Sequence, residues 1–310
     1  MFDRRNSIHL FRLFGIDVYL NWLWLLAVGY FIYQYVHNGG GEWYWGLLLC
    51  LSLYLIVLIH EFGHQLACRQ VGGKTRDIML WPFGGVAFVT PPERPGAQLW
   101  SIAAGPLVNA VLIPVFYGLL VLFFHLGWET SHPQTLEFVA DVAMVNLLLL
   151  KFNLLPIYPL DGGQIVRSLL WFVIGRARSL LVTSIIGFIG VGCLLLYAGW
   201  ELVMQQDTSG GLWLAMISVF ILMNCWGGLK MALLLGRLAK IPRRGGYACP
   251  DCHNSPPAGN YWRCNHCGVT FDLFLTAGVC PGCQKQFQRS NCLDCGTLHS
   301  LPEWMVPPPA

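Results

Sequence analysis

Charged residues are scarce in this 310-residue sequence: they make up 11% of it, whereas hydrophobic residues make up 55%. A soluble globular domain carries about 25% charged residues, which it needs on its water-facing surface. The shortage excludes an ordinary soluble enzyme and predicts a chain embedded in a membrane over most of its length. The formal net charge of +3 is also too small to indicate a nucleic-acid partner by itself.

The N-terminal region lacks the pattern of a cleavable signal peptide. Arg4, Arg5 and Arg12 precede an apolar run, but that run, from Val18 to Val36, is rich in Trp and Tyr rather than ending in small residues. Its length is about what a membrane span requires. We therefore interpret it as a retained first transmembrane helix.

Six apolar stretches are long enough to span a bilayer, at about 20 residues per span. They run approximately over Leu20–Val36, Trp43–Ala67, Leu99–Phe124, Leu136–Leu155, Leu180–Val203 and Leu212–Leu235. Lys and Arg are absent from every second connection, at residues 37–42, 125–135 and 204–211. The positive-inside rule then places both termini in the cytosol. The expected fold is an α-helical multi-pass membrane protein of the cell membrane.

Two connections do more than join helices. The segment Lys74–Pro95 contains Trp81-Pro82-Phe83-Gly84-Gly85-Val86, which is apolar but interrupted, and predicts either a strand pair or a re-entrant loop. The segment Asn153–Gly163 contains Pro156 and Pro159, which make a continuous helix there unfavourable.

The motif His60-Glu61-Phe62-Gly63-His64 lies near the cytosolic end of the second span. Residues four apart lie on nearly the same face of a helix, so both imidazoles can bind one Zn²⁺ while Glu61 acts as general base. Such a pentapeptide also occurs by chance, but an ionisable group in a span costs at least about 2.5 kcal/mol and is functional by default.

Catalytic zinc usually has three protein ligands, and Asp161 is the best third candidate. The topology brings it to the same membrane depth as His64. The alternative is that Asp161-Gly162 makes a turn or caps the next helix. Asparagines within spans commonly bond across helices as packing contacts; we favour that interpretation for Asn146 and leave Asn109 open.

Together these motifs resemble the site-2 protease family of intramembrane zinc metalloproteases, in its six-span branch without a PDZ insertion. The resemblance covers roughly residues 10–240. The matching motifs are His60-Glu61-x-x-His64, Phe83-Gly84-Gly85, Ala104-Gly105-Pro106-Leu107-Val108-Asn109, Asn153-Leu154-Leu155-Pro156 and Leu160-Asp161-Gly162-Gly163.

The resemblance implies that His60, His64 and Asp161 bind zinc and that Glu61 is the catalytic base. It also implies that Asn153 and the Phe83-Gly84-Gly85 segment contact the substrate, a transmembrane protein in the lipid bilayer. The alternatives are a proteolytically silent scaffold, which the complete ligand set disfavours, and a zinc transporter, for which other spans offer few polar residues.

Composition changes after Ile241, so we divide the chain into a transmembrane metalloprotease core (1–241), a linker (242–246), a small cytosolic module (247–296) and a tail (297–310). Eight cysteines in the module form four C-x-x-C pairs: Cys249 and Cys252, Cys264 and Cys267, Cys280 and Cys283, and Cys292 and Cys295. The pattern resembles two tandem zinc ribbons, although crossed pairing between the sets stays open.

The ribbons would bind two structural zinc ions beside the single catalytic one. A redox role for the C-x-x-C pairs is disfavoured, because four copies occur without a thioredoxin-like pattern. The module has a slight acidic excess from Tyr247 onward, which disfavours nucleic acid. Contact with protein is favoured: capture of the substrate, binding of a cytosolic protein regulator, or docking on the enzyme's own cytosolic mouth. A purely stabilising role is the alternative.

Overall fold

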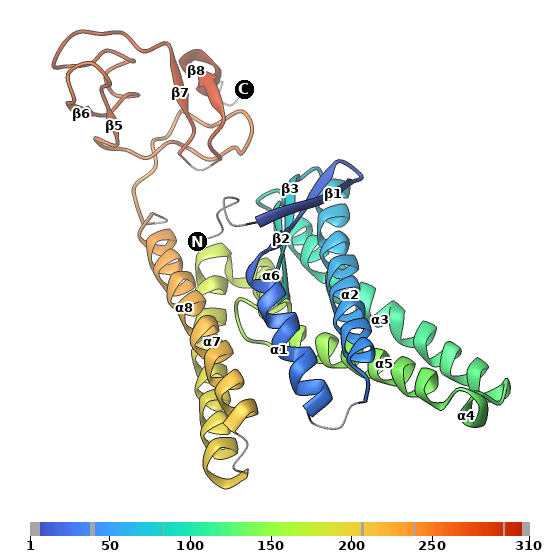
Figure 1. Cartoon of the computed structure of the whole chain (residues 1–310). Helices are drawn as coiled ribbons and strands as arrows, with labels where there is room; N and C mark the ends of the chain where they lie inside the picture. The colour runs from blue at the N-terminus through green and yellow to red at the C-terminus, as the bar shows by residue number, and fades with distance from the viewer. Residues whose placement is uncertain are drawn as a thin grey trace. The chain divides into compact units, whose positions relative to one another are not determined.

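The computed structural model describes residues 7–37, 41–82, 84–205, 208–238, 240–293 and 295–305. The chain forms two compact units that divide after Leu233. The elements of the larger unit are β1 (Ser7–Leu13), β2 (Ile16–Asn21), α1 (Leu23–His37), α2 (Trp43–Gln70), β3 (Lys74–Trp81), β4 (Gly84–Thr90), α3 (Pro95–His125), α4 (Trp128–Ser131), α5 (Pro133–Asn153), α6 (Asp161–Ile174), α7 (Arg176–Trp200), a π-helical turn (Glu201–Gln205) and all but the last turn of α8 (Thr208–Leu238) (Figure 1).

The larger unit contains a four-stranded sheet in the order β1-β2-β3-β4. Its outer pairs are antiparallel, whereas β2 and β3 are parallel, with Val18 opposite Ile78. The expectation that a transmembrane helix begins near Val18 is wrong, because the helix α1 begins only at Leu23. The alternating residues Ile16, Val18 and Leu20 are buried, as a half-buried strand requires.

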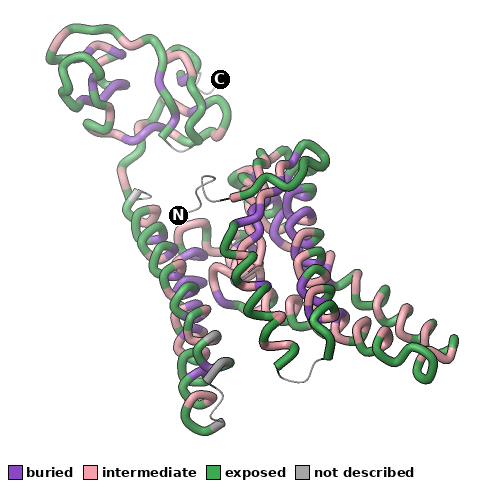
Figure 2. The backbone as a smooth tube through the Cα atoms, viewed as in Figure 1, coloured by how far each residue is buried: buried purple, intermediate pink, exposed green. Residues whose placement is uncertain are grey.

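The segment after α2 folds as the antiparallel hairpin β3–β4, which decides between the two forms expected from its sequence. The sheet packs on α2, and their shared core includes Val57 and Phe62 from the helix and Ile78 and Leu80 from β3. Figure 2 shows buried residues gathered along α2 and the sheet, whereas the outer faces of the helices are exposed. Because β4 is the last strand in the order, it has one edge that no other described strand joins.

Within the described part of the chain, four helical segments are long and apolar enough to cross a membrane: Trp43–Gln70, Pro95–His125, Arg176–Met204 and Gly210–Arg237. The other two expected spans are weaker. The helix α1 has only 15 residues, and α5 contains Glu137, Asp141 and Lys151. The break expected after Asn153 is present, since α5 ends at that residue and α6 begins at Asp161. The chain is thus a mostly helical integral membrane protein.

The smaller unit contains two short hairpins, β5 (Trp262–Arg263) with β6 (Thr270–Phe271) and β7 (Arg289–Asn291) with β8 (Leu298–Ser300), then a 3-10 turn, Leu301–Trp304. Its core contains Phe271, Phe274 and Trp304, which is only 1% exposed. Residues 297–305, assigned by composition to a tail, therefore belong to the folded unit.

The segment assigned by composition to a linker is also ordered against the smaller unit. The backbone N–H of Arg244 donates to the Pro256 carbonyl at 2.8 Å, and that of Ala258 donates to the Pro242 carbonyl at 2.8 Å. Gly-rich composition alone does not reveal these contacts, because they join residues distant in sequence.

Candidate metal centres

The two histidines of the helix α2 lie one turn apart, and their Nε2 atoms are 3.1 Å from each other. His60, Glu61 and His64 are all buried, at 5%, 7% and 7% exposure. The helix therefore presents both imidazoles to one point in the interior of the unit. Glu61 follows His60 directly and lines the same cavity.

Asp161 completes this group from the first turn of α6. Its Oδ2 atom lies 3.1 Å from His60 Nε2 and 3.4 Å from His64 Nε2. Glycine at the next two positions permits this placement. A Cβ at Gly162 would lie 2.3 Å from the Leu154 carbonyl oxygen, and one at Gly163 would lie 2.4 Å from the Tyr158 nitrogen.

The protonation pattern of this group fits a metal ion. A backbone carbonyl only accepts, so His64 Nδ1 donates to the Ser101 oxygen at 2.9 Å, which leaves a lone pair on Nε2 of the neutral ring. Among the described residues, the buried Asp161 Oδ2 accepts no hydrogen bond. Ligands of a tetrahedral zinc lie about 3.3–3.4 Å apart, close to the separations found here.

Two further glycines let neighbouring backbones approach the site. A Cβ at Gly105 of α3 would lie 2.3 Å from His64 Nε2, and a Cβ at Gly85 of β4 would lie 2.5 Å from Glu61 Cγ. Sequence patterns do not reveal these contacts, because each depends on a neighbour distant in the chain.

A cavity of about 530 Å³ opens beside the side chains of His60, His64 and Asp161. It is lined by Gly84 and Gly85 of β4, by Asn153 at the end of α5, and by apolar side chains of α8 such as Phe220. The structure thus brings Asn153, Gly84 and Gly85 to the same space as Glu61. Phe83, expected to contact the substrate with them, lies outside the described residues.

The sequence model of peptidase family M50 matches residues 48–139 and 127–197. These ranges include His60, Glu61, His64 and Asp161. The chain belongs to this family. A Synechocystis sp. protein named provisionally as a zinc metalloprotease is 32% identical, over 73% of this chain and 61% of its own length. Zinc metalloprotease MJ0392 of Methanocaldococcus jannaschii is 32% identical, over 58% and 50%. The chain spans about half to three fifths of these relatives.

The solved structure of a site-2 protease from Methanocaldococcus jannaschii is also similar to this chain. Its TM-score is 0.53 at 25% sequence identity, and the match covers 72% of this chain and 95% of that one. The family-M50 assignment therefore rests on both sequence and fold, and the matched family residues lie within the larger unit.

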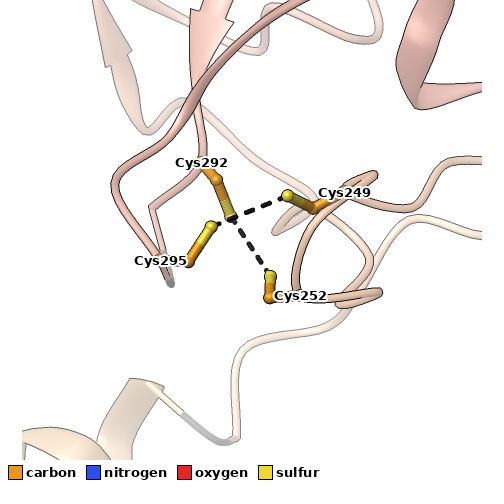
Figure 3. A group of neighbouring side chains, drawn as sticks. All are labelled: Cys249, Cys252, Cys292 and Cys295. Carbon is orange, nitrogen blue, oxygen red and sulfur yellow. Dashed lines mark hydrogen bonds between the residues drawn. The ribbon is translucent and has the colours of Figure 1, made fainter. Parts of the chain in front are cut away.

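The smaller unit of this M50 family member contains two groups of four cysteines, and their pairing is nested. The first and last C-x-x-C pairs come together as Cys249, Cys252, Cys292 and Cys295, drawn in Figure 3. The two middle pairs come together as Cys264, Cys267, Cys280 and Cys283. The four pairs therefore do not form two zinc ribbons in sequential order.

The ends of the smaller unit explain the nested order. Tyr247 bridges to Met305, and the Ala248 N–H donates to the Trp304 carbonyl at 2.8 Å, so the first and last cysteine pairs meet. Cysteine sulfur atoms of neighbouring pairs lie 3.5–3.7 Å apart within the two groups, which is too long for disulfides. Tetrahedral zinc with thiolate ligands requires about 3.8 Å, so both groups fit a zinc ion.

A buried ion pair fixes the segment that precedes the first cysteine pair. Asp272 is 3% exposed, accepts from the Gly259 N–H at 2.8 Å and the Leu275 N–H at 3.0 Å, and pairs with Arg244. Burial alone would raise the pKa of Asp272, but these hydrogen bonds and the Arg244 guanidinium outweigh it and hold the pKa below its ordinary value.

Proposed function

We propose that this chain is an intramembrane zinc metalloprotease that hydrolyses peptide bonds in or near transmembrane segments of membrane proteins. The observation that carries the proposal is the convergence of His60 Nε2, His64 Nε2 and Asp161 Oδ2 beside Glu61, at a cavity that residues of β4 help to line. The names of the relatives support the same reaction class.

His60, His64 and Asp161 would hold the catalytic zinc, which supplies Lewis acidity that polarises a carbonyl and activates water near neutral pH. Glu61 then acts as general base: its carboxylate takes a proton from the attacking water and returns it to the leaving amine nitrogen. The cavity beside Glu61 is mostly apolar in its lining on α8, which limits the water around the reacting groups.

A substrate helix must unwind before attack, because its backbone groups are internally hydrogen-bonded in lipid. We propose that the unwound strand adds to the free edge of β4, with Asn153 contacting it from the other side of the cavity. Strand addition satisfies the exposed backbone groups of the substrate. Gly84 and Gly85 leave that stretch of the edge without side chains.

We further propose six spans in the cell membrane with both termini in the cytosol, α1 and α5 being the two less apolar spans. The two cysteine groups would each hold a structural zinc ion, making three zinc ions per chain. The module they stabilise would bind a cytosolic protein regulator. The alternative, a silent scaffold acting through this module, is disfavoured by the complete set of site residues.

Substitution of Glu61 by Gln tests the reaction. We expect purified Glu61→Gln protein to keep three zinc ions, because no ligand changes, and to lose cleavage by at least about 10²-fold, the range of a missing general base. Comparison of membrane proteomes from cells with each form should show an uncleaved membrane protein that accumulates with Glu61→Gln. Wild-type rates in the variant would contradict the role of Glu61.

A further inference from the structure

Two asparagines inside the larger unit form an interlocked pair next to His60. Asn109 of α3 and Asn146 of α5 are both 0% exposed. Asn109 Nδ2 donates to Asn146 Oδ1 at 2.8 Å, while Asn146 Nδ2 donates to the backbone oxygen of Asn109 at 3.0 Å. The remaining side-chain oxygen, Asn109 Oδ1, lies 2.5 Å from His60 Nδ1.

The orientation of every group in this pair follows from one fixed acceptor. The backbone oxygen of Asn109 only accepts, so Asn146 must turn its NH₂ group toward it. Asn146 Oδ1 then receives the NH₂ group of Asn109, and Asn109 Oδ1 is left facing His60. His60 Nδ1 must donate to this oxygen, so the neutral ring has its lone pair on Nε2, which faces Asp161.

We propose that Asn109 and Asn146 are positioning residues that fix the tautomer and ring orientation of His60 and thereby set the affinity of the catalytic site for zinc. The inference rests on the metal site of the proposed function and deepens it. His64 has a backbone acceptor at Ser101, which no side-chain change removes. His60 depends on a side chain, and that side chain depends on Asn146.

A packing role for the same pair makes a different prediction. An interhelical amide contact contributes about 1 kcal/mol to helix association wherever it lies, and its loss lowers stability without a specific effect on zinc. Outer hydrogen-bond partners of metal-binding histidines, in contrast, change metal affinity by about 10–100-fold when they are removed. Zinc affinity therefore separates the two roles, and stability alone does not.

The test is a zinc titration of the purified full chain in detergent, equilibrated across buffered free Zn²⁺ concentrations, with zinc per chain as the readout. For Asn109→Leu we expect occupancy of the His60, His64 and Asp161 site to need about 10–100-fold more free zinc. For Asn146→Leu we expect a smaller shift in the same direction. The Cys-ligated zinc ions should titrate unchanged in every form and serve as an internal reference.

The double variant tests whether Asn146 acts through Asn109. If it does, Asn109→Leu with Asn146→Leu shifts the titration no further than Asn109→Leu alone, because interacting residues are not additive. Thr183→Val is the matched control: Thr183 is equally buried, and its hydroxyl donates to the Ser179 carbonyl of its own helix at 2.9 Å. Its zinc titration should match that of the wild type.

The inference would be overturned if the free Zn²⁺ concentration at half-occupancy of the catalytic zinc site stayed within twofold of the wild-type value in both Asn variants. It would also be overturned if Thr183→Val raised that concentration as much as the Asn variants do. If Asn109→Leu does not fold, the zinc titration of Asn146→Leu alone tests the inference. This variant keeps the Asn109 side chain beside His60 but removes the hydrogen bonds that fix the orientation of the Asn109 amide. No cleavage is measured, so the outcome is distinct from that of Glu61→Gln. A wild-type chain in which the site of His60, His64 and Asp161 binds no zinc, while both cysteine groups are filled, would overturn both the inference and this metal site.

Discussion

Substitution of Gly105 by Ala tests how closely α3 approaches the metal ligands. The added Cβ would lie 2.3 Å from His64 Nε2 and 2.7 Å from His60 Nε2. Nonbonded heavy atoms prefer about 3.5–4.0 Å, so the His64 ring must move by about 1 Å or more unless α3 retreats. Metal–ligand distances tolerate about 0.2 Å, so we expect the catalytic zinc to be lost.

The assay for Gly105→Ala measures zinc per chain together with cleavage. We expect a decrease from three to two zinc ions and a loss of cleavage greater than about 10²-fold, the effect of a 1 Å misplacement. Gly118→Ala is the matched control, because Gly118 lies on the same helix and its Cβ would meet nothing within 4 Å. Any gain in helix propensity is the same for both. Three zinc ions and wild-type cleavage in Gly105→Ala would refute the reasoning.

Two further predictions concern the smaller unit. With nested pairing, the double variant Cys252→Ser with Cys295→Ser loses one cysteine site and keeps two zinc ions per chain, whereas Cys252→Ser with Cys267→Ser loses both cysteine sites and keeps one. With sequential pairing, the first double variant would keep one zinc ion and the second would keep two. Metal analysis of the two purified double variants distinguishes the pairings. Asp272→Asn should destabilise the unit by about 3–5 kcal/mol, because it breaks a buried ion pair. The Asp272 pKa is lowered by folding, so its contribution is complete above the unfolded value of about 3.9 and is lost below it. Hydrogen exchange of the full chain should show the same difference in unfolding free energy of the smaller unit between wild type and Asp272→Asn from pH 7 to pH 5. A difference that decreases within that range would contradict the prediction.

The sequence predicts the parts of the site whose geometry is local. Two histidines four residues apart must share a helix face, and proline at positions 156 and 159 must interrupt the chain before Asp161. The topology then brings Asp161 to the depth of His64, and the structure brings them within 3.4 Å. Each of these steps follows from chain connectivity and membrane depth.

Long-range contacts account for what the sequence did not predict. Residues 18–20 lie in the apolar run expected to begin a span, and pairing with β1 and β3 makes them part of a strand instead. Four equivalent C-x-x-C pairs have no local signal for their partners, and the contact of Ala248 with Trp304 selects the nested order. The link from Asn146 to His60 joins three helices, so spacing along any one of them does not reveal it.

Close helix packing and the placement of the candidate metal ligands are therefore coupled in this chain. Lipid offers no hydrophobic force that drives helices together, so membrane helices associate through small residues that let their backbones approach. At the site those small residues are Gly63 and Gly105, where α2 and α3 meet, and Gly162 beside Asp161; a Cβ at Gly63 would lie 2.8 Å from the Ala104 carbonyl oxygen. Because the same contacts set helix separation and the positions of His60, His64 and Asp161, we expect a substitution that loosens the packing here to displace at least one of these candidate ligands as well.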